Sequence, residues 1–426
     1  MGSVTHTALR NITADLTVSN QYVSPVNQIC LTNTTYQNCN TITSIDLHHV
    51  PFVNNDASNA FTYCYKLTSI SNINQNITNM KSMFDGCYNL SSVSKLPTAP
   101  TDMSLCFGSC NALTTAPEIP NSVTNIAYCF AQCYNLVNTP IIPNSVTNMA
   151  YSFGFCYNLT QVSTIPNSVT DMTNAFQYCN RLVNAPVISD GVTSMMNTFT
   201  GCSLLQNVPD IPNSVTAMRG TFCNCISLTD APVVSNSVTT LYQTFWSCTN
   251  LVNVPVIPHG VANLYYTFDS CYSLKNVVDI PNSVTAMQGT FSGCNSLTTA
   301  PNIPESVSTL GYAFYRCTNL AGDIYIYSNH VTQMYLKQCF NGSDLQKNVY
   351  IPFTYENGEY TQTYNSFIAA GYTTTGTQNN VYLRDFADIP YEVDDTEYTI
   401  RQGTDELYLT KYIGTNAEVV VPRSKT

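Results

Sequence analysis

Residues 146–168 read VTNMAYSFGFCYNLTQVSTIPNS, and variants of this 23-residue unit follow one another along most of the chain. In each unit a Cys follows the Phe by three residues, and a Leu follows the Cys by three. The Phe recurs twelve times at a spacing of 23, as Phe61, Phe84, Phe107, Phe130, Phe153, Phe176, Phe199, Phe222, Phe245, Phe268, Phe291 and Phe314. A unit this short cannot bury its own apolar side, so successive units must stack and share a core.

The repeat predicts a solenoid of parallel β type. Degenerate copies around Cys39 and Cys339 extend the array to about 14 coils over residues 36–345. From each repeat Leu to the Ile six residues later we expect one short strand per coil, paired in parallel with its neighbours. The Val-Thr-x-Met segment is a second candidate for extended backbone. The Phe-x-x-Cys segment lacks Gly and Pro in most copies, and we expect a helical or 3₁₀ turn there.

The period fails at residue 346, and this divides the chain into four predicted segments. Residues 1–35 are expected to form an N-terminal cap or attachment segment, and residues 36–345 the solenoid. Residues 346–384 show a strand, helix and strand pattern and are predicted to form an α+β C-terminal cap, because an open sheet edge invites aggregation. Residues 385–426 are predicted to form an acidic linker and the start of a small β module. A linker is favoured over a calcium site, because no calcium-loop spacing is present.

The composition excludes several classes of function. Of the 426 residues, 44% are hydrophobic and 10% are charged, so the chain can bury a core and is expected to fold. The 15 basic residues against 26 acidic ones give a net charge of −11, which argues against nucleic acid as a partner. No apolar run approaches the roughly 20 residues of a membrane-spanning helix. The first residues show no secretory signal, so we expect either that a signal was removed or that the protein leaves the cell by another route.

The cysteines fall on the repeat. Equivalent positions in stacked coils are farther apart than the roughly 3.8 Å that a disulfide needs between Cβ atoms, so we expect free, buried thiols. Cys106, Cys110, Cys129 and Cys133 have a spacing that resembles a zinc site, but Cys110 and Cys133 are ordinary repeat positions. Cys223 breaks the pattern and is the expected exception to a free ladder. We therefore predict no metal and no cofactor.

Catalytic motifs are absent from the sequence. None of the five His residues lies in a metal-binding or nucleophile motif. Asp210 and Asp230 fall in neighbouring coils, but we expect them on the order of 10 Å apart, beyond the carboxylate separations of glycosidases. We predict no catalytic residue and no enzyme activity.

The exposed strand face is the predicted binding surface. The second residue after each repeat Leu is a polar, mostly uncharged side chain: Thr115, Asn138, Gln161, Asn184, Asn207, Asp230, Asn253 and Asn276. These eight residues, called here the polar ladder, offer repeated donors and acceptors without a pocket, which suits an extended partner better than a small molecule. A stripe of Tyr, with members such as Tyr151 and Tyr157, is a second candidate surface.

The F-x-x-C-x-x-L core, the 23-residue step and the I-P-N-S-V-T segment resemble the BspA-like leucine-rich repeats of bacterial surface proteins, over roughly residues 36–345. The resemblance implies a leucine-rich-repeat rod with a non-enzymatic role in adhesion or recognition. It also implies an extracellular or cell-surface location and a partner that is a host or cell-surface protein or glycan. The chain departs from the family in showing no export signal and no cell-wall anchor.

Two other functions stay open. A phage tail or fibre protein in the virion is the alternative hypothesis, and the missing export signal is its main support. A polysaccharide-cleaving enzyme is a weaker hypothesis, since it would need a carboxylate pair at catalytic spacing. Association into homo-oligomers is left open.

Overall fold

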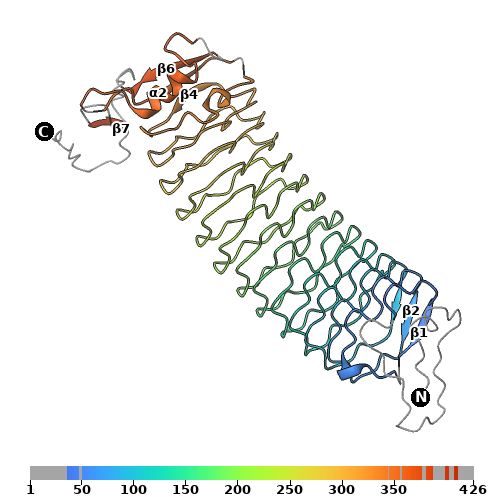
Figure 1. Ribbon diagram of the computed structural model, residues 1–426. Helices are drawn as coiled ribbons and strands as arrows, with labels where there is room; N and C mark the ends of the chain where they lie inside the picture. The colour runs from blue at the N-terminus through green and yellow to red at the C-terminus, as the bar shows by residue number, and fades with distance from the viewer. Residues whose placement is uncertain are drawn as a thin grey trace, which may run out of the picture. The chain divides into compact units, whose positions relative to one another are not determined.

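The computed structural model describes residues 36–47, 50–343, 345–355, 357–376 and 380–386, with the backbone of 399–402 and 407–410. The predictions for residues 1–35 and for most of 385–426 fall outside these described residues. The chain forms two compact units, Met1–Leu251 and Val252–Thr426. In each unit, successive 23-residue repeats lie one upon the next as coils (Figure 1).

The repeat Phe residues form the centre of each unit. All twelve are at most 1% exposed. In the first unit the rings from Phe61 to Phe245 stack in succession, with centroids of neighbouring coils 5.5–5.9 Å apart. In the second unit the stack runs from Phe268 to Phe314 and continues onto Phe340, at 5.7 Å for each step. The predicted solenoid core is therefore confirmed in both units.

In the twelve regular repeats the segment from Met to Cys forms turns and not a helix, which corrects the sequence prediction. The degenerate last coil does have a 3₁₀ turn here, at Leu336–Gln338. In the repeat of Phe153, the N–H groups of Tyr151 and Phe153 donate to the next coil at 2.8 and 2.9 Å. The intervening N–H of Ser152 instead donates to Met149 O within the coil at 3.0 Å. Tyr151 has a φ of 61° and Phe155 a φ of 63°, so left-handed residues interrupt any helix. Stacking dictates this backbone, because alternate N–H groups must face the neighbouring coil.

Regular strands are rarer than predicted. In the first unit a three-stranded parallel sheet comprises β1 (Ser44–Asp46), β2 (Ser69–Ser71) and β3 (Ser92–Val93), and a 3₁₀ turn, η1, spans Val53–Asn55. Beyond β3 the polar-ladder position of the described coils of this unit forms single parallel bridges, such as the one joining Asn184 and Asn207. Proline explains the loss of regular strands, because Pro lacks the N–H that a sheet ladder requires and recurs in this part of the repeat.

The Val-Thr-x-Met segment forms the longer parallel ladder. Its central residue bridges to the equivalent residue of the next coil from Asp56 through to Ala217. Several of these residues also order their own turn, since the side-chain oxygen of Asn148 accepts from the N–H of Ala150 at 2.9 Å. The second extended stretch considered from the sequence is thus present.

Within its described residues, the second unit contains a parallel sheet, which begins in the last repeats, and an α-helix past them. The sheet has the order β4 (Gly322–Tyr325), β5 (Lys347–Ile351) and β6 (Val381–Asp385), and the helix α2 spans Gln362–Ala369. The N-cap of α2 is Thr361, whose hydroxyl accepts from the N–H of Tyr364 at 3.1 Å. These elements follow the predicted strand, helix and strand pattern. Their role as a cap stays a prediction.

Three further short elements lie in the described part of the second unit. A 3₁₀ turn, η2 (Leu336–Gln338), follows β4. The strands β7 (Thr399–Gln402) and β8 (Leu407–Thr410) pair in antiparallel fashion. Both strands lie within residues 385–426, which the sequence predicts to form an acidic linker and the start of a small β module.

Candidate binding surface

All eight residues of the polar ladder are exposed. In the first unit, parallel bridges join Thr115 to Asn138 and Asn138 to Gln161, and a separate bridge joins Asn184 to Asn207. In the second unit a bridge joins Asn253 to Asn276. The repeat therefore brings ladder residues of neighbouring coils side by side, as the sequence spacing predicts.

Two pairs of ladder amides are hydrogen-bonded to each other. Asn207 Nδ2 donates to Asn184 Oδ1 at 2.6 Å, and Asn276 Nδ2 donates to Asn253 Oδ1 at 2.9 Å. Each bond fixes the orientation of two side chains but uses one donor and one acceptor of the several that the pair carries. The remaining N–H and oxygen groups are oriented and exposed, and they can bind a partner with little further loss of side-chain entropy.

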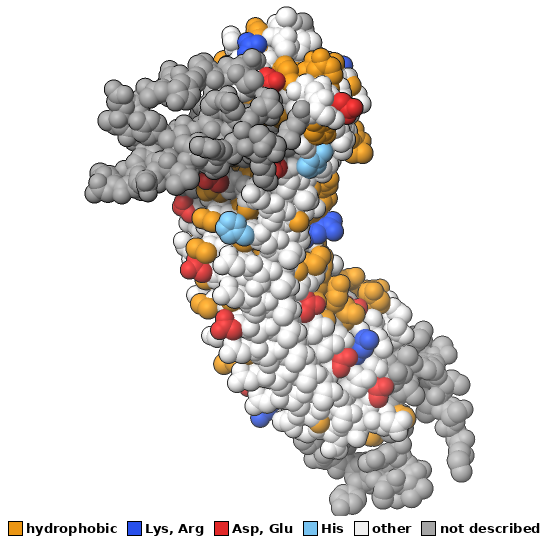
Figure 2. Space-filling model, turned by 90° about the vertical axis from the view of Figure 1, so that its left-hand side faces the viewer, with side chains coloured by type: hydrophobic (Ala, Val, Ile, Leu, Met, Phe, Trp, Pro, Cys, Tyr) orange, Lys and Arg blue, Asp and Glu red, His pale blue; other side chains and the backbone are white. Residues whose placement is uncertain are grey.

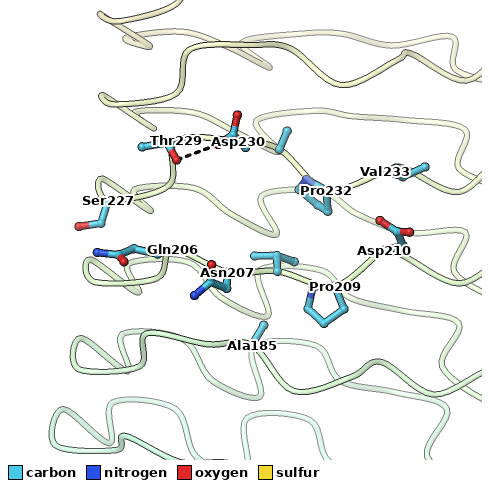
Figure 3. Close-up of a pocket in the computed structure, with 12 residues that line it drawn as sticks. Ala185, Gln206, Asn207, Pro209, Asp210, Ser227, Thr229, Asp230, Pro232 and Val233 are labelled. Atoms are coloured by element: carbon cyan, nitrogen blue, oxygen red, sulfur yellow. Dashed lines mark hydrogen bonds between the residues drawn. The ribbon is translucent and has the colours of Figure 1, made fainter.

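A shallow hollow of about 780 Å³ lies on the first unit beside the ladder. Figure 3 shows that its lining comes from neighbouring coils, and two ladder residues, Asn207 and Asp230, are among the lining residues. The hydroxyl of Thr229 donates to Asp230 Oδ2 at 3.0 Å, which orients that carboxylate. Prolines and the side chain of Val233 form the apolar part of the lining. The hollow thus combines oriented polar groups with an apolar edge.

The two carboxylates of this hollow differ in their setting. Asp230 lies next to Thr229, whereas Asp210 lies farther along the neighbouring coil, beyond Pro209 (Figure 3). Among the residues that the structure describes, no group of three or more His, Cys, Asp or Glu side chains could hold a metal ion.

The sequence prediction missed the apolar edge of this surface. Where the middle residue of the Pro-x-Ile segment is apolar it is highly exposed, as shown by Ile141 at 82% and Val187 at 71%, and Val233, which precedes Val234, is 64% exposed. The signal was present in the sequence as a β-branched residue directly before the buried Ile. The face in Figure 2 is mostly neither charged nor hydrophobic, with scattered acidic and hydrophobic side chains.

The Tyr stripe forms stacked pairs in the first unit. Tyr128 stacks on Tyr151 with ring centroids 4.7 Å apart, and Tyr134 stacks on Tyr157 at 5.0 Å. Stacking covers one face of each ring, so these Tyr residues partly stabilise one another. Tyr128 is still 43% exposed.

The cysteine ladder has a structural role. All 17 described cysteines are free and buried, including Cys223, which the sequence singled out as the exception. The thiol of Cys133 donates to the carbonyl of Phe107 at 3.2 Å, and the same bond recurs in other coils, for example from Cys156 to Phe130. Burial raises the pKa of Cys133 to about 12. A thiol with so high a pKa is a poor nucleophile at neutral pH.

Asp85 is a half-buried acid that the sequence did not reveal. It directly follows the repeat Phe84, and a Cβ atom added at Gly108 of the next coil would lie 2.6 Å from Asp85 Oδ1. This close packing removes part of the water around the carboxyl group. Burial raises its pKa to about 6, and the N–H of Gly86 opposes part of that shift.

Among the helices that the structure describes, none has the length and apolar character that crossing a bilayer requires.

Comparison with known families agrees with the repeat. The sequence matches the family described as BspA type leucine rich repeat region in overlapping segments that together span 18–367, namely 18–137, 57–183, 127–252, 173–277 and 256–367. No curated protein matches the chain.

Several solved structures of bacterial leucine-rich repeat proteins match this chain. A leucine-rich repeat protein from Bacteroides ovatus has a TM-score of 0.55 and 19% sequence identity, over 77% of this chain and 86% of that chain. A leucine rich cell surface protein from Faecalibacterium prausnitzii is 22% identical with a TM-score of 0.39, over 70% of this chain and 82% of that one. A leucine-rich repeat protein from Eubacterium ventriosum is 19% identical with a TM-score of 0.43, over 71% and 83%.

Proposed function

Because the chain belongs to the BspA type leucine-rich repeat family, we propose that it is a non-enzymatic adhesion or recognition protein. Its partner is an extended protein or glycan on a host or cell surface, and the polar ladder is its contact surface. The protein acts outside the cell or at the cell surface, as the family resemblance implies. Nothing in the described part of the structure favours the phage virion protein or the polysaccharide-cleaving enzyme over this function, and both stay predictions.

The observation that carries the proposal is the repetition of exposed, oriented amides. Asn184 and Asn207 present the same group in successive coils and are held by their mutual bond of 2.6 Å. An extended partner with its own repeat can meet several such groups in register. Each contact is weak, with a net contribution of about 1 kcal/mol, so affinity comes from their number.

The hollow beside Asn207 and Asp230 adds a place where a side chain or sugar of the partner can enter. Its apolar edge at Val233 supplies area that water leaves on binding, and its polar lining fixes orientation. A partner that contacts both the polar ladder and this hollow needs few charged groups for binding. This agrees with the small number of charged side chains on the surface.

The test is binding of the labelled chain to intact bacterial cells and to extracellular-matrix proteins. The test variant replaces Asn138, Asn184, Asn207 and Asn253 by Ala. The matched control replaces four exposed Asn residues of the Pro-Asn-Ser turns, namely Asn144, Asn167, Asn213 and Asn282. Both variants carry three changes in the first unit and one in the second.

We expect saturable binding of the parent protein. The ladder variant should bind at least tenfold more weakly than the parent, and the control variant should bind as tightly as the parent. Circular dichroism and thermal melting check that both variants are folded. Equal binding by the two variants would contradict the ladder as the contact surface. Absence of binding to every cell and matrix protein would contradict the adhesive function.

A further inference from the structure

The second unit has a hollow of its own, away from the polar ladder. It has a volume of about 490 Å³, and α2 and the hairpin before it contribute most of the lining. The residues that matter are Gln333, Tyr355, Tyr360, Gln362 and Asn365. None of the seven lining residues is charged. The hollow is therefore an uncharged site with two aromatic rings and three carboxamide groups.

The hairpin fixes the two tyrosines relative to α2. Thr354 and Tyr360 form an antiparallel bridge, and the N–H of Tyr355 donates to Glu359 O at 2.7 Å. Thr361 then caps the helix and donates from its hydroxyl to Pro352 O at 2.6 Å. The Thr361 hydroxyl thus links the hairpin to the helix, because it donates to Pro352 O and accepts from the N–H of Tyr364. The site is therefore largely preformed.

Tyr360 presents a supported ring. Its ring stacks on that of Tyr364 with centroids 4.6 Å apart and an interplanar angle of 16°. Tyr364 in turn packs against Phe353 at 4.7 Å. Tyr360 is nevertheless 58% exposed, so one face is backed by a ring while the rest of the side chain is open. The electron-rich face of an aromatic ring attracts polarised C–H groups such as those on one side of a pyranose.

The carboxamides have spare hydrogen-bonding capacity. Within the described part of the chain, the side chains of Gln333 and Gln362 form no hydrogen bond with another residue. Asn365 donates from Nδ2 to Tyr360 O at 3.4 Å and keeps its Oδ1. A carboxamide both donates and accepts, which matches a sugar hydroxyl group that does the same. The exposed carboxylate of Glu359, beside Tyr360, would repel an anionic sugar.

We propose that this hollow binds a neutral pyranose residue of a glycan, with the ring stacked on Tyr360 and its hydroxyl groups hydrogen-bonded to Gln333, Gln362 and Asn365. The site is independent of the proposed function of the polar ladder. It gives the protein a second, sugar-specific contact in the part of the chain that follows the repeats.

The test is affinity electrophoresis of the full chain in gels that contain a polysaccharide. The neutral probes are mannan, a β-glucan, a galactan and starch, and the anionic probes are alginate and hyaluronate. The variants are Tyr360→Ala, Tyr360→Phe and a Gln362→Ala/Asn365→Ala double variant, whose two changes lie at exposed positions of α2. The control is Tyr272→Ala, a Tyr of the second unit that is 48% exposed and does not line the hollow.

We expect at least one neutral polysaccharide to retard the protein. Tyr360→Ala and the double variant should weaken this binding at least tenfold, while Tyr360→Phe and Tyr272→Ala should leave it within about twofold, because stacking needs the ring and not the hydroxyl. The double variant keeps the test decisive if Tyr360→Ala fails to fold.

Three results would overturn the site: no retardation by any neutral polysaccharide, retardation by the anionic ones alone, or binding that Tyr360→Ala and the double variant leave unchanged. The ladder variant with four Asn→Ala changes should keep this sugar binding. Loss of sugar binding in that variant alone would place the glycan on the ladder instead. The two proposals can therefore fail separately.

Discussion

At the scale of single residues, burial decides what each side chain can do in this protein. The thiols lie inside the coils and donate to Phe carbonyls, so a residue type known for its reactivity acts here as a small apolar side chain with one weak donor. The spacing from Cys106 to Cys133 resembles that of a metal site because the 23-residue repeat places Cys at the same positions of neighbouring coils. The side chains that can contact a partner are therefore those that the repeat leaves exposed.

Asp85 is a half-buried acid whose partial burial has a measurable consequence. Its pKa is raised to about 6, above the value of about 3.9 expected in the unfolded chain. The folded protein therefore holds this proton more tightly, and the contribution of Asp85 to stability falls as the pH rises from about 4 to about 6. Asp85→Asn should raise the free energy of unfolding on the order of 1 kcal/mol at pH 7.5, after allowance for solvent screening, and much less at pH 4.

Urea denaturation of Asp85→Asn and the parent protein at pH 4 and pH 7.5 measures this difference. Asp190→Asn, at an exposed position of the same unit, is the control. A gain in stability that is equal at both pH values, or that is larger at pH 4, would show that the carboxyl group is not desolvated in the folded protein.

At the scale of elements, the left-handed residues are the feature that defines each coil. Positive φ angles recur two residues before and two residues after the repeat Phe, for example at Tyr151 and Phe155. Gly takes the same positions in some coils, including Gly86 and Gly201. The left-handed conformation thus depends on the position in the coil and not on the residue type. The strain of an L-residue there is offset by the packing of neighbouring coils.

Gly86→Ala tests this strain. Gly86 has a φ of 72°, and an added Cβ would lie 2.3 Å from Tyr63 Cδ1. We expect the change to lower the free energy of unfolding by about 1–2 kcal/mol, because an L-residue is strained in this region. Ser247→Gly, at the equivalent position with a φ of 58°, is the opposite change, and it should alter stability by less than about 1 kcal/mol.

Chemical denaturation of the two variants provides the measurement. Both changes lie in the first unit, so they report on the same cooperative structure. Equal stability of Gly86→Ala and the parent protein would mean that the backbone at this position relaxes away from the left-handed region.

The same elements show what the sequence could predict and what it could not. The period of the Phe, Cys and Leu positions was enough to predict the stacked core and the exposed ladder, because both depend on the repeat alone. The left-handed turns were missed, since Tyr, Gln and Ser fill half of these positions and do not favour them. The available signal was Gly at 86, 201, 220, 289 and 293 and Asn at 59, 174, 197 and 224. The hollow beside α2 was beyond prediction, because it depends on how a non-repeating hairpin packs against that helix.

At the scale of the whole molecule, the net charge and the chemistry of the polar ladder predict different kinds of partner. The chain carries a net charge of −11, yet seven of the eight ladder residues are uncharged amides or hydroxyls. A partner that recognised the acidic residues would be steered by long-range attraction and released by salt. A partner that binds amides is held by short-range hydrogen bonds, which salt screens little.

Salt dependence therefore distinguishes the two modes of binding. For the cell-surface or matrix partner of the ladder, we expect the Kd to change by less than about threefold between 50 and 500 mM NaCl, because few charged pairs form at the ladder. Biolayer interferometry with the parent protein and the four-Asn ladder variant measures this. If high salt weakens the affinity of both proteins equally, by tenfold or more, the acidic side chains and not the polar ladder make the decisive contacts.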